Sequence, residues 1–247
     1  MLTERHGVVK AVARGARRPG SRFAGRLEPF VLARVMLRPG RELDAVSQAE
    51  TVDARASLRG DYVRFLMGEA MLELAWRSLH EGQQSSRLFQ ALDASLRCLE
   101  GDAVRPDLLL AAFELKICGL LGYRPSFQRC SRCGISLRGK AASFSPEGGG
   151  VVCGSCRPAG AAGRTLRAET LALAEAAVST PLKGLAGLRV TEEQSASLLR
   201  LAIEYVEYHL DRRLRSHAAV LQHLGGGGDG GQARPLRPGG PDKSFPL

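Results

Sequence analysis

The sequence predicts an α+β protein in which a small β-barrel precedes a mainly helical part. Short apolar or β-branched runs without helices between them occupy the first forty residues, which is typical of a small barrel. From Asp61 onward the apolar residues recur close to helical spacing. Two Cys-x-x-Cys pairs inside the helical part predict a small inserted metal-binding module.

The N-terminal strands are expected at residues 7–13 and 30–37, which are apolar or β-branched. Residues 14–22 lie between them and are basic and rich in turn-forming Gly and Pro. Pro39-Gly40 marks a second turn. We assign these elements to a first domain that covers residues 1–57.

The second domain, residues 58–224, is predicted to be mainly helical. Pro106 suits the first turn of a helix, and Thr191 with Gln194 has the pattern of a capping box. The predicted helices cover residues 62–76 with a stop at 80–82, about 86–100, about 106–121, a stretch after Thr191, and about 212–224. Residues 225–247 contain twelve Gly or Pro among 23 residues, which predicts a disordered tail.

The formal net charge of +10 is concentrated near the N-terminus. Residues 1–41 contain ten Arg or Lys and two acids, which gives +8. The chain has 30 Arg but only five Lys, a usage that a GC-rich genome produces by itself, so the position of the charge carries the argument. A polyanion is the expected partner, either nucleic acid or an anionic surface. The candidate DNA-binding residues are Lys10, Arg14, Arg17, Arg18, Arg22 and Arg26.

Four cysteines form the strongest chemical motif of the sequence. Cys130 and Cys133 are followed after 19 residues by Cys153 and Cys156, a spacing that presents four thiolates to one tetrahedral zinc ion. Two disulfides or a redox pair are the alternatives, but disulfides are disfavoured in the cytoplasm. Four protein ligands leave no open position, so we expect about one structural zinc ion per chain, in a module at about 126–160.

Other motifs are weaker. Residues 134–141 match the start of a phosphate-binding loop, but Ala141 replaces the required Ser or Thr, and the segment lies between the cysteine pairs. His80-Glu81 begins like a zinc-protease motif, but Gln84 replaces the second His. Cys98 and Cys118 lie in apolar helical patterns and are expected to be buried thiols. No set of residues indicates an enzyme.

The chain is expected to be cytoplasmic and without a membrane partner. No apolar run reaches the ~18 residues typical of a membrane span. Residues 1–10 lack the zones of a signal peptide.

Several stretches together resemble the RecO family of bacterial recombination mediators. They are residues 6–30, residues 112–125, the two cysteine pairs with residues 144–151 between them, and residues 204–210. The resemblance extends over residues 2–224 in the same order. It implies an N-terminal OB-fold, followed by a helical domain that carries the zinc module as an insertion.

The same resemblance implies function and partners. It implies binding of single- and double-stranded DNA, annealing of complementary strands, and work with RecR and the acidic C-terminal tail of the single-strand-binding protein (SSB). RecA would be loaded indirectly, and the protein would lie at the nucleoid. Phe23 and Phe30 are the only aromatic residues before Tyr62, so we expect binding to the DNA backbone rather than base readout.

Two alternatives belong to other classes. A zinc-stabilised protein–protein adaptor would use the basic N-terminus to contact an acidic partner. A zinc-dependent hydrolase would require an open metal site and a general base. A DNA-binding titration tests the adaptor hypothesis, and the number of metal ligands tests the hydrolase hypothesis.

The resemblance begins inside the barrel. Family members usually start some twenty residues before the position that Leu2 matches, and those residues supply the first barrel strand. Either the start codon is assigned too late or the barrel is incomplete. We expect in-frame codons upstream of Met1 that encode an alternating apolar strand.

Overall fold

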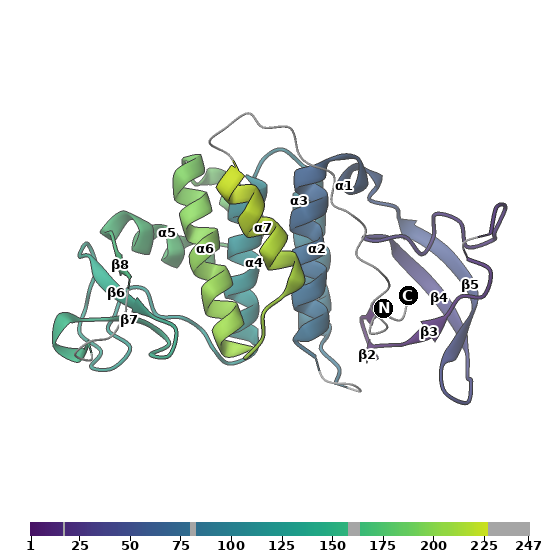
Figure 1. Cartoon of the computed structure of the whole chain (residues 1–247), viewed down its shortest axis with the longest axis horizontal. Helices are drawn as coiled ribbons and strands as arrows, with labels where there is room; N and C mark the ends of the chain where they lie inside the picture. Colours follow the sequence, from purple (N-terminus) through teal and green to yellow (C-terminus); the bar gives the residue numbers. More distant parts are fainter. Residues whose placement is uncertain (17, 80–82, 158–163, 227–247) are drawn as a thin grey trace.

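A computed structural model describes residues 1–16, 18–79, 83–157 and 164–226 (Figure 1). The predicted tail after residue 226, Arg17 and the predicted helix stop at 80–82 lie outside the described residues. The N-terminal strands lie at one end of the molecule, the helices form its middle, and a second small sheet lies at the other end (Figure 1). The fold is therefore α+β, as the sequence predicted.

The N-terminal strands form two small sheets. β1 (Leu2–Thr3) pairs with β2 (Gly7–Val8), and β5 (Asp44–Asp53) lies between β3 (Ala11–Val12) and β4 (Leu32–Arg38). Among the described residues these two sheets do not join into a closed barrel.

The predicted strand at residues 7–13 is wrong in one respect, because it is divided between the two sheets. Val9 still pairs with Met1 in continuation of the β1–β2 register, and the two residues exchange both backbone hydrogen bonds at 2.8 Å. The chain then starts a new pairing, parallel to β5, at Ala11. The second predicted strand is confirmed as β4.

Two side chains are prominent among the contacts that join the N-terminal part to the helices. Phe30, with a φ of 69°, packs against α2 (Tyr62–Arg77) at Gly68, where an added Cβ would lie 2.7 Å from the Phe30 ring. Only glycine permits this approach. The second contact is Arg55, which is 4% exposed and forms ion pairs with Asp53 and with Asp93 of α3 (Ser86–Glu100).

The predicted helices are confirmed, and their ends follow the predicted signals. Pro106 occupies the first turn of α4 (Pro106–Leu120). Thr191 and Gln194 form both hydrogen bonds of a capping box at α6 (Glu192–His209), which satisfies two N–H groups that a helix start leaves unpaired. The last helix, α7 (Arg215–Gly226), begins three residues later than predicted.

Three further helical segments were not predicted from the sequence. They are α1 (Ala56–Gly60), α5 (Ala168–Ser179) and the 3₁₀ segment η2 (Leu182–Gly187). Neither α1 nor α5 has a side-chain cap, so the sequence gives no signal for where these helices begin. Much of α5 is alanine, whose small side chain makes the apolar face of the helix hard to recognise in the sequence.

Helix α4 is the centre of the helical part. Eleven of its fifteen residues are buried, and it contacts α2, α3, α5 and α6. Each fully buried leucine or phenylalanine contributes about 1.5–3 kcal/mol. The same burial encloses two carboxyl groups, those of Asp107, which is 6% exposed, and Glu114, which is 0% exposed.

Glu114 is paired with a buried histidine. Nε2 of His217, on α7, lies 3.0 Å from Oε1 of Glu114, and its Nδ1 lies 3.1 Å from Oε1 of Glu207 on α6. Burial lowers the pKa of His217, but the two carboxylates outweigh burial, so the pKa is raised above its ordinary value of 6.5. Burial also raises the pKa of Glu114 above its ordinary value of 4.5.

Both shifts give the same dependence of stability on pH. A group with a raised pKa in the folded state contributes stability that is fully present below its unfolded pKa and is lost as pH rises through its folded pKa. We therefore expect the free energy of unfolding to fall as pH rises above about 6.5, the ordinary pKa of the imidazole, and to fall less in His217→Gln. Chemical denaturation at a series of pH values measures both slopes.

His6→Gln is the matched control, since His6 is exposed, and it should keep the wild-type slope. His217→Ala, which leaves Glu114 buried without its partner, should cost about 3–5 kcal/mol. Equal slopes for wild type and His217→Gln would show that the buried pair does not control the pH dependence.

Candidate metal centre and nucleic-acid interface

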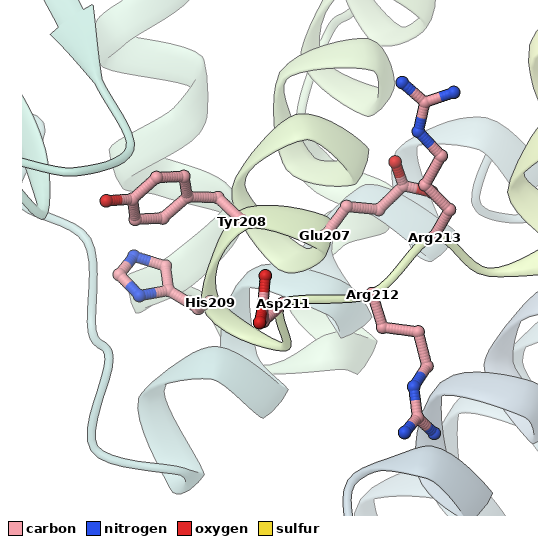
Figure 2. Close-up of a pocket in the computed structure, with 6 residues that line it drawn as sticks. All are labelled: Glu207, Tyr208, His209, Asp211, Arg212 and Arg213. Carbon is pink, nitrogen blue, oxygen red and sulfur yellow. The ribbon is translucent and has the colours of Figure 1, made fainter.

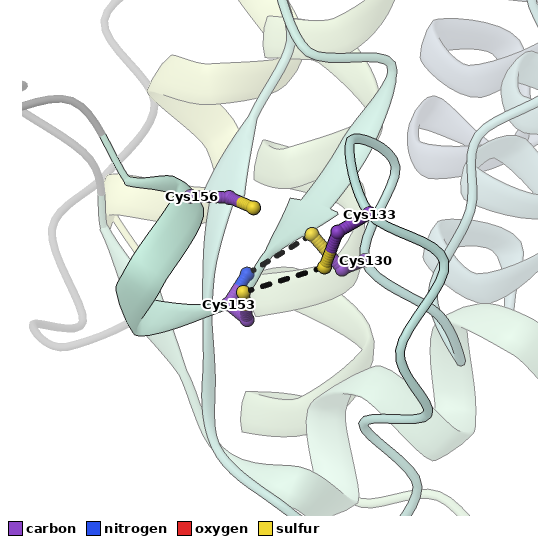
Figure 3. A group of neighbouring side chains, drawn as sticks. All are labelled: Cys130, Cys133, Cys153 and Cys156. Carbon is purple, nitrogen blue, oxygen red and sulfur yellow. Dashed lines mark hydrogen bonds between the residues drawn. The ribbon is translucent and has the colours of Figure 1, made fainter.

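The four predicted cysteine ligands meet at one point of the structure (Figure 3). Their Sγ atoms all lie within 4.8 Å of one another, and those of Cys133 and Cys153 are 3.7 Å apart. Four sulfurs placed about 2.3 Å from a central zinc ion would be separated by roughly 3.8 Å. The six cysteines are free thiols, so the disulfide alternative does not describe this structure.

The first cysteine pair lies on a tight knuckle. Cys130 receives a hydrogen bond on its carbonyl from the N–H of Gly134 at 2.8 Å, and its own N–H donates to the carbonyl of Ile135 at 2.9 Å. Gly134 adopts a φ of 75°, a left-handed conformation that glycine adopts without steric cost. The knuckle directs both thiols to the same side.

The second pair starts a 3₁₀ turn, η1 (Gly154–Cys156), directly after β7 (Gly150–Val152). The N–H of Cys156 donates to the carbonyl of Cys153 at 3.1 Å. Gly150 has a φ of 137°, and an added Cβ would lie 2.2 Å from the carbonyl oxygen of Ser126. This close approach packs the strand before the second knuckle against the segment before the first.

The electrostatics of the thiols fit a cation. Burial acts to raise the pKa of Cys130, but backbone N–H groups of Cys133, Cys153 and Arg132 point at its sulfur and lower the pKa to about 6. The neighbouring thiols of Cys133 and Cys153 raise the pKa of Cys156 to about 12. Four thiols this close do not all ionise alone, whereas a divalent ion at their centre stabilises all four thiolates. The four cysteines could therefore hold a metal ion.

A small hydrophobic core attaches this module to the helices. β6 (Ala142–Ser145) pairs with β7 and β8 (Thr165–Leu166). The ring of Phe144 of β6 stacks on that of Phe127, with the centroids 6.2 Å apart, and its centroid lies 5.8 Å from that of the Tyr205 ring of α6. The hydroxyl of Tyr205 donates to the carbonyl of Tyr123 at 3.1 Å. The metal candidate site is thus built on a packed support.

Of the weaker motifs, His80-Glu81 lies outside the described residues. Residues 134–141 form loops and turns that lead into strand β6 rather than into a helix. Cys118 is buried, and burial raises its pKa to about 12. Cys98 is only half-buried, so the prediction of a buried thiol is wrong for this residue. The histidine that sequence reasoning missed is His217, because no spacing in the sequence connects it with Glu114.

Of the candidate DNA-binding residues, Lys10 lies between β2 and β3, and Arg14, Arg18, Arg22 and Arg26 lie on turns or bends of the segment that follows, at the end of the molecule opposite the cysteines (Figure 1). Lys10, Arg14, Arg18, Arg22 and Arg26 are exposed, and Arg17 lies outside the described residues. Successive turns shape this segment, with Gly15, Gly20 and Gly25 at φ values of 76°, 72° and 71°.

The two early aromatic residues are not available to stack on bases. Phe23 and Phe30 are 3% and 4% exposed. Phe23 lies under the guanidinium of Arg22, whose Cζ is 4.8 Å from the ring centroid. The expectation of backbone contacts without base readout therefore gains support from the packing.

Two cavities lie at the C-terminal end of α6. Figure 2 shows one of about 670 Å³, where Tyr208 and His209 lie close together while Arg212 and Arg213 point apart. A second cavity of about 430 Å³ adjoins it and shares His209 and Arg212. Its other lining residues are Trp76, Arg77, Ser78, Leu79, Gln83, Leu121, Tyr123 and Leu210.

Comparison with known proteins identifies the family. The family model described as "Recombination protein O C terminal" matches residues 59–218, and "Recombination protein O N terminal" matches residues 1–55. The chain belongs to the RecO family.

Curated RecO relatives cover most of the chain. A "DNA repair protein RecO" of Pelotomaculum thermopropionicum is 37% identical over 218 residues, 88% of this chain and 84% of the relative. Proteins of the same name from Nocardioides sp. and Frankia casuarinae are 37% and 38% identical over 223 and 224 residues. These matches cover 89% and 87% of this chain, and 90% and 87% of the relatives. Membership in the RecO family indicates a role in DNA repair and recombination.

No helix in the described part of this RecO-family chain combines the length and apolar character needed to cross a bilayer.

Proposed function

We propose that this chain is a recombination mediator that binds single- and double-stranded DNA and anneals complementary strands. With RecR, it would help to load RecA on DNA coated with SSB. The observation that carries the proposal is the +8 charge of residues 1–41, much of it on exposed turns, in a chain of the RecO family. Such a role needs no catalytic step and would place the protein at the nucleoid in the cytoplasm.

Residues 1–57 are proposed as an OB-type DNA-binding domain. Lys10, Arg14, Arg17, Arg18, Arg22 and Arg26 would contact phosphates. Neutralised phosphates release counterions, which gives affinity without base recognition. Residues 58–224 would be the helical domain and would position the partners.

Zinc is the proposed metal of the four-cysteine site. Soft thiolates with a tetrahedral arrangement favour zinc. Cys130, Cys133, Cys153 and Cys156 would supply all four ligands, so the ion would stabilise the module of residues 126–160 and would not act on a substrate. A hydrolase would need a free coordination position.

The cavity of about 430 Å³ is proposed as the site for the acidic tail of SSB. Its apolar side chains, Trp76, Leu79 and Leu210, would cover apolar groups of a peptide. Arg77 and Arg212 also line it and would pair with peptide carboxylates.

The metal content of the purified protein and of a ligand variant provides the test of the proposed zinc site. The purified protein should contain about one zinc ion per chain by elemental analysis. Cys133→Ser should abolish zinc binding and unfold the module, because a structural zinc site contributes roughly 10–16 kcal/mol of apparent binding energy. Cys98→Ser is the matched control and should keep its zinc. Protein without metal and with four freely reactive thiols would contradict the proposal.

The DNA site is tested by the salt dependence of affinity. Each phosphate contact contributes about 0.7 to the slope of log K against log salt on single strands. Changing Arg14, Arg17, Arg18 and Arg22 to Ala should therefore flatten the slope by roughly two to three units, equally for unrelated sequences. Fluorescence titration at several salt concentrations measures it.

The control variant for this titration changes Arg87, Lys183, Arg189 and Arg213, four exposed cations outside the basic segment, to Ala. It removes the same charge and should keep the slope. An unchanged slope in the folded N-terminal variant would move the DNA site elsewhere. If the wild type does not bind DNA, the adaptor hypothesis replaces the mediator.

The SSB-tail site is tested with the intrinsic fluorescence of Trp76, the only tryptophan of the chain. A synthetic acidic SSB-tail peptide should change this fluorescence on binding, and Arg212→Glu should weaken binding at least tenfold by repelling the peptide. Arg189→Glu is the control of equal charge. Equal affinity of the two variants would place the tail outside this cavity.

A further inference from the structure

The four-cysteine module together with its flanking segments, residues 124–167 in all, is the second strongly basic part of the chain. Residues 124–167 contain eight Arg or Lys and one acid, Glu147, which gives +7. Residues 42–123 have thirteen acids and eight bases, which gives −5, and residues 168–247 are neutral with nine of each. Together with the +8 of residues 1–41, these values add up to the total of +10.

The two basic regions lie at opposite ends of the molecule. Figure 1 shows β3, β4 and β5 at one end, β6, β7 and β8 at the other, and the helices between them. Four of the thirteen acids of residues 42–123 lie at positions 42–53, on or next to β5, so they belong to the N-terminal end. Residues 58–123, which include α2, α3 and α4 of this middle part, have seven bases and nine acids, which gives −2. A negatively charged polymer would therefore meet two attractive ends separated by a part with a net negative charge.

Codon usage does not explain the charge of the module. A GC-rich genome raises the arginine content everywhere, and residues 42–123 also contain seven arginines. There, thirteen acids outnumber the bases. In the module the acids are nearly absent, which codon bias towards arginine does not produce.

The charges of the module are available to a partner. Arg124, Arg129, Arg132, Arg138, Lys140, Arg157, Arg164 and Arg167 are exposed. Arg129 and Arg138 donate hydrogen bonds to uncharged acceptors, the carbonyl of Gly134 and the amide oxygen of Gln128. Within the described residues, the side chains of Arg132, Lys140, Arg164 and Arg167 form no hydrogen bond or ion pair.

Backbone hydrogen bonds hold together several of the segments that carry these side chains. Arg129 pairs with Ser136 across the first knuckle, and the N–H of Leu137 donates to the carbonyl of Gln128 at 2.8 Å. Arg132 lies between the two cysteines of that knuckle. The carbonyl of Arg164, directly before β8, accepts a hydrogen bond from the N–H of Phe144 at 3.0 Å. This bond holds the start of β8 against β6, the strand that follows Lys140 in the sequence.

We propose that the four-cysteine module is a second nucleic-acid surface, which binds the phosphate backbone of a DNA strand separate from the one at the N-terminal turns. This rests on the proposed function, in that the partner is DNA. Four thiolates and one zinc ion carry a charge of −2, which still leaves +5 on the module. Its aromatic rings Phe127 and Phe144 are buried, so phosphates rather than bases are the ligand.

Two separate surfaces give the annealing activity a physical basis. Each end would hold one strand by counterion release, and the linked ends would raise the effective concentration of one strand near the other. Neither surface reads bases, so the bound strands keep their pairing edges free for each other.

The test compares three fourfold variants of the full-length protein, each lacking four cations. The module variant changes Arg132, Lys140, Arg164 and Arg167 to Ala. The N-terminal variant changes Arg14, Arg17, Arg18 and Arg22, and the control changes Arg87, Lys183, Arg189 and Arg213. Circular dichroism and zinc content establish that each variant is folded.

A single-stranded oligonucleotide of about ten nucleotides, close to the length that one small domain covers, is titrated at low salt. Wild type and control should bind two oligonucleotides per chain, and the module variant and the N-terminal variant one each. The module variant should also flatten the salt slope by roughly two to three units. Its annealing rate for complementary strands should fall at least tenfold.

The outcomes separate this proposal from the proposed function. A folded, zinc-containing module variant with wild-type stoichiometry, slope and annealing rate would overturn the second surface and leave the N-terminal site intact. If only the module variant loses a bound oligonucleotide, while the N-terminal variant binds like the wild-type protein, the second surface is supported and the N-terminal site is contradicted.

Two further variants keep the test decisive. If the fourfold module variant loses zinc, Lys140→Ala with Arg164→Ala replaces it, since both residues lie outside the cysteine knuckles, and about half the slope change is expected. Changing Arg132, Arg164 and Arg167 to Lys should preserve binding, because a phosphate contact needs the charge. Equal loss in the Lys and Ala versions would argue against phosphate binding.

Discussion

The enclosure of helix α4 is the constraint on which the rest of the structure depends. Four other helices contact this helix, and most of its residues are buried. A helix covered on so many sides cannot leave a charged group without a partner. Glu114 meets that requirement through His217, whose other ring nitrogen faces Glu207. The pair therefore connects α4, α6 and α7, and the last helix is held by electrostatics as well as by packing.

The same bundle supports both proposed functional ends. Towards the N-terminus, Phe30 packs on α2 and the buried Arg55 pairs with Asp53 and Asp93. Towards the cysteine module, Tyr205 of α6 contacts Phe144 and donates to the carbonyl of Tyr123. Each end is thus attached by a few specific contacts and presents its cations on turns and knuckles. The packed helices of the middle then separate the two basic regions.

Charge segregation gives the molecule its functional character. Outside residues 1–41 and 124–167, the chain has a net charge of −5, so the positive potential belongs to the two ends. A molecule of this kind attracts the nucleic-acid backbone without recognising a sequence. For the proposed strand annealing this would be an advantage, since the bases must remain free to pair.

Local patterns in the sequence determined several elements of this protein. The cysteine spacing, the capping box at Thr191, Pro106 at the start of α4 and the concentration of charge before residue 41 each depend on neighbours within a few residues, or on counts, and these are visible in the chain. Strand pairing was only partly predictable. The division of residues 7–13 between two sheets follows from the pairing of β3 with β5, which lies more than thirty residues away.

Only the tertiary structure decided which polar groups are buried and which distant segments meet. His217 and Glu114 are 103 positions apart in the sequence, and their contact exists because α7 packs across the bundle. The burial of Phe23 and Phe30, the closeness of the four sulfurs and the opposite placement of the two basic regions have the same origin. Residue type and spacing determine what a segment can do chemically, whereas burial and distance depend on the packing of the whole chain.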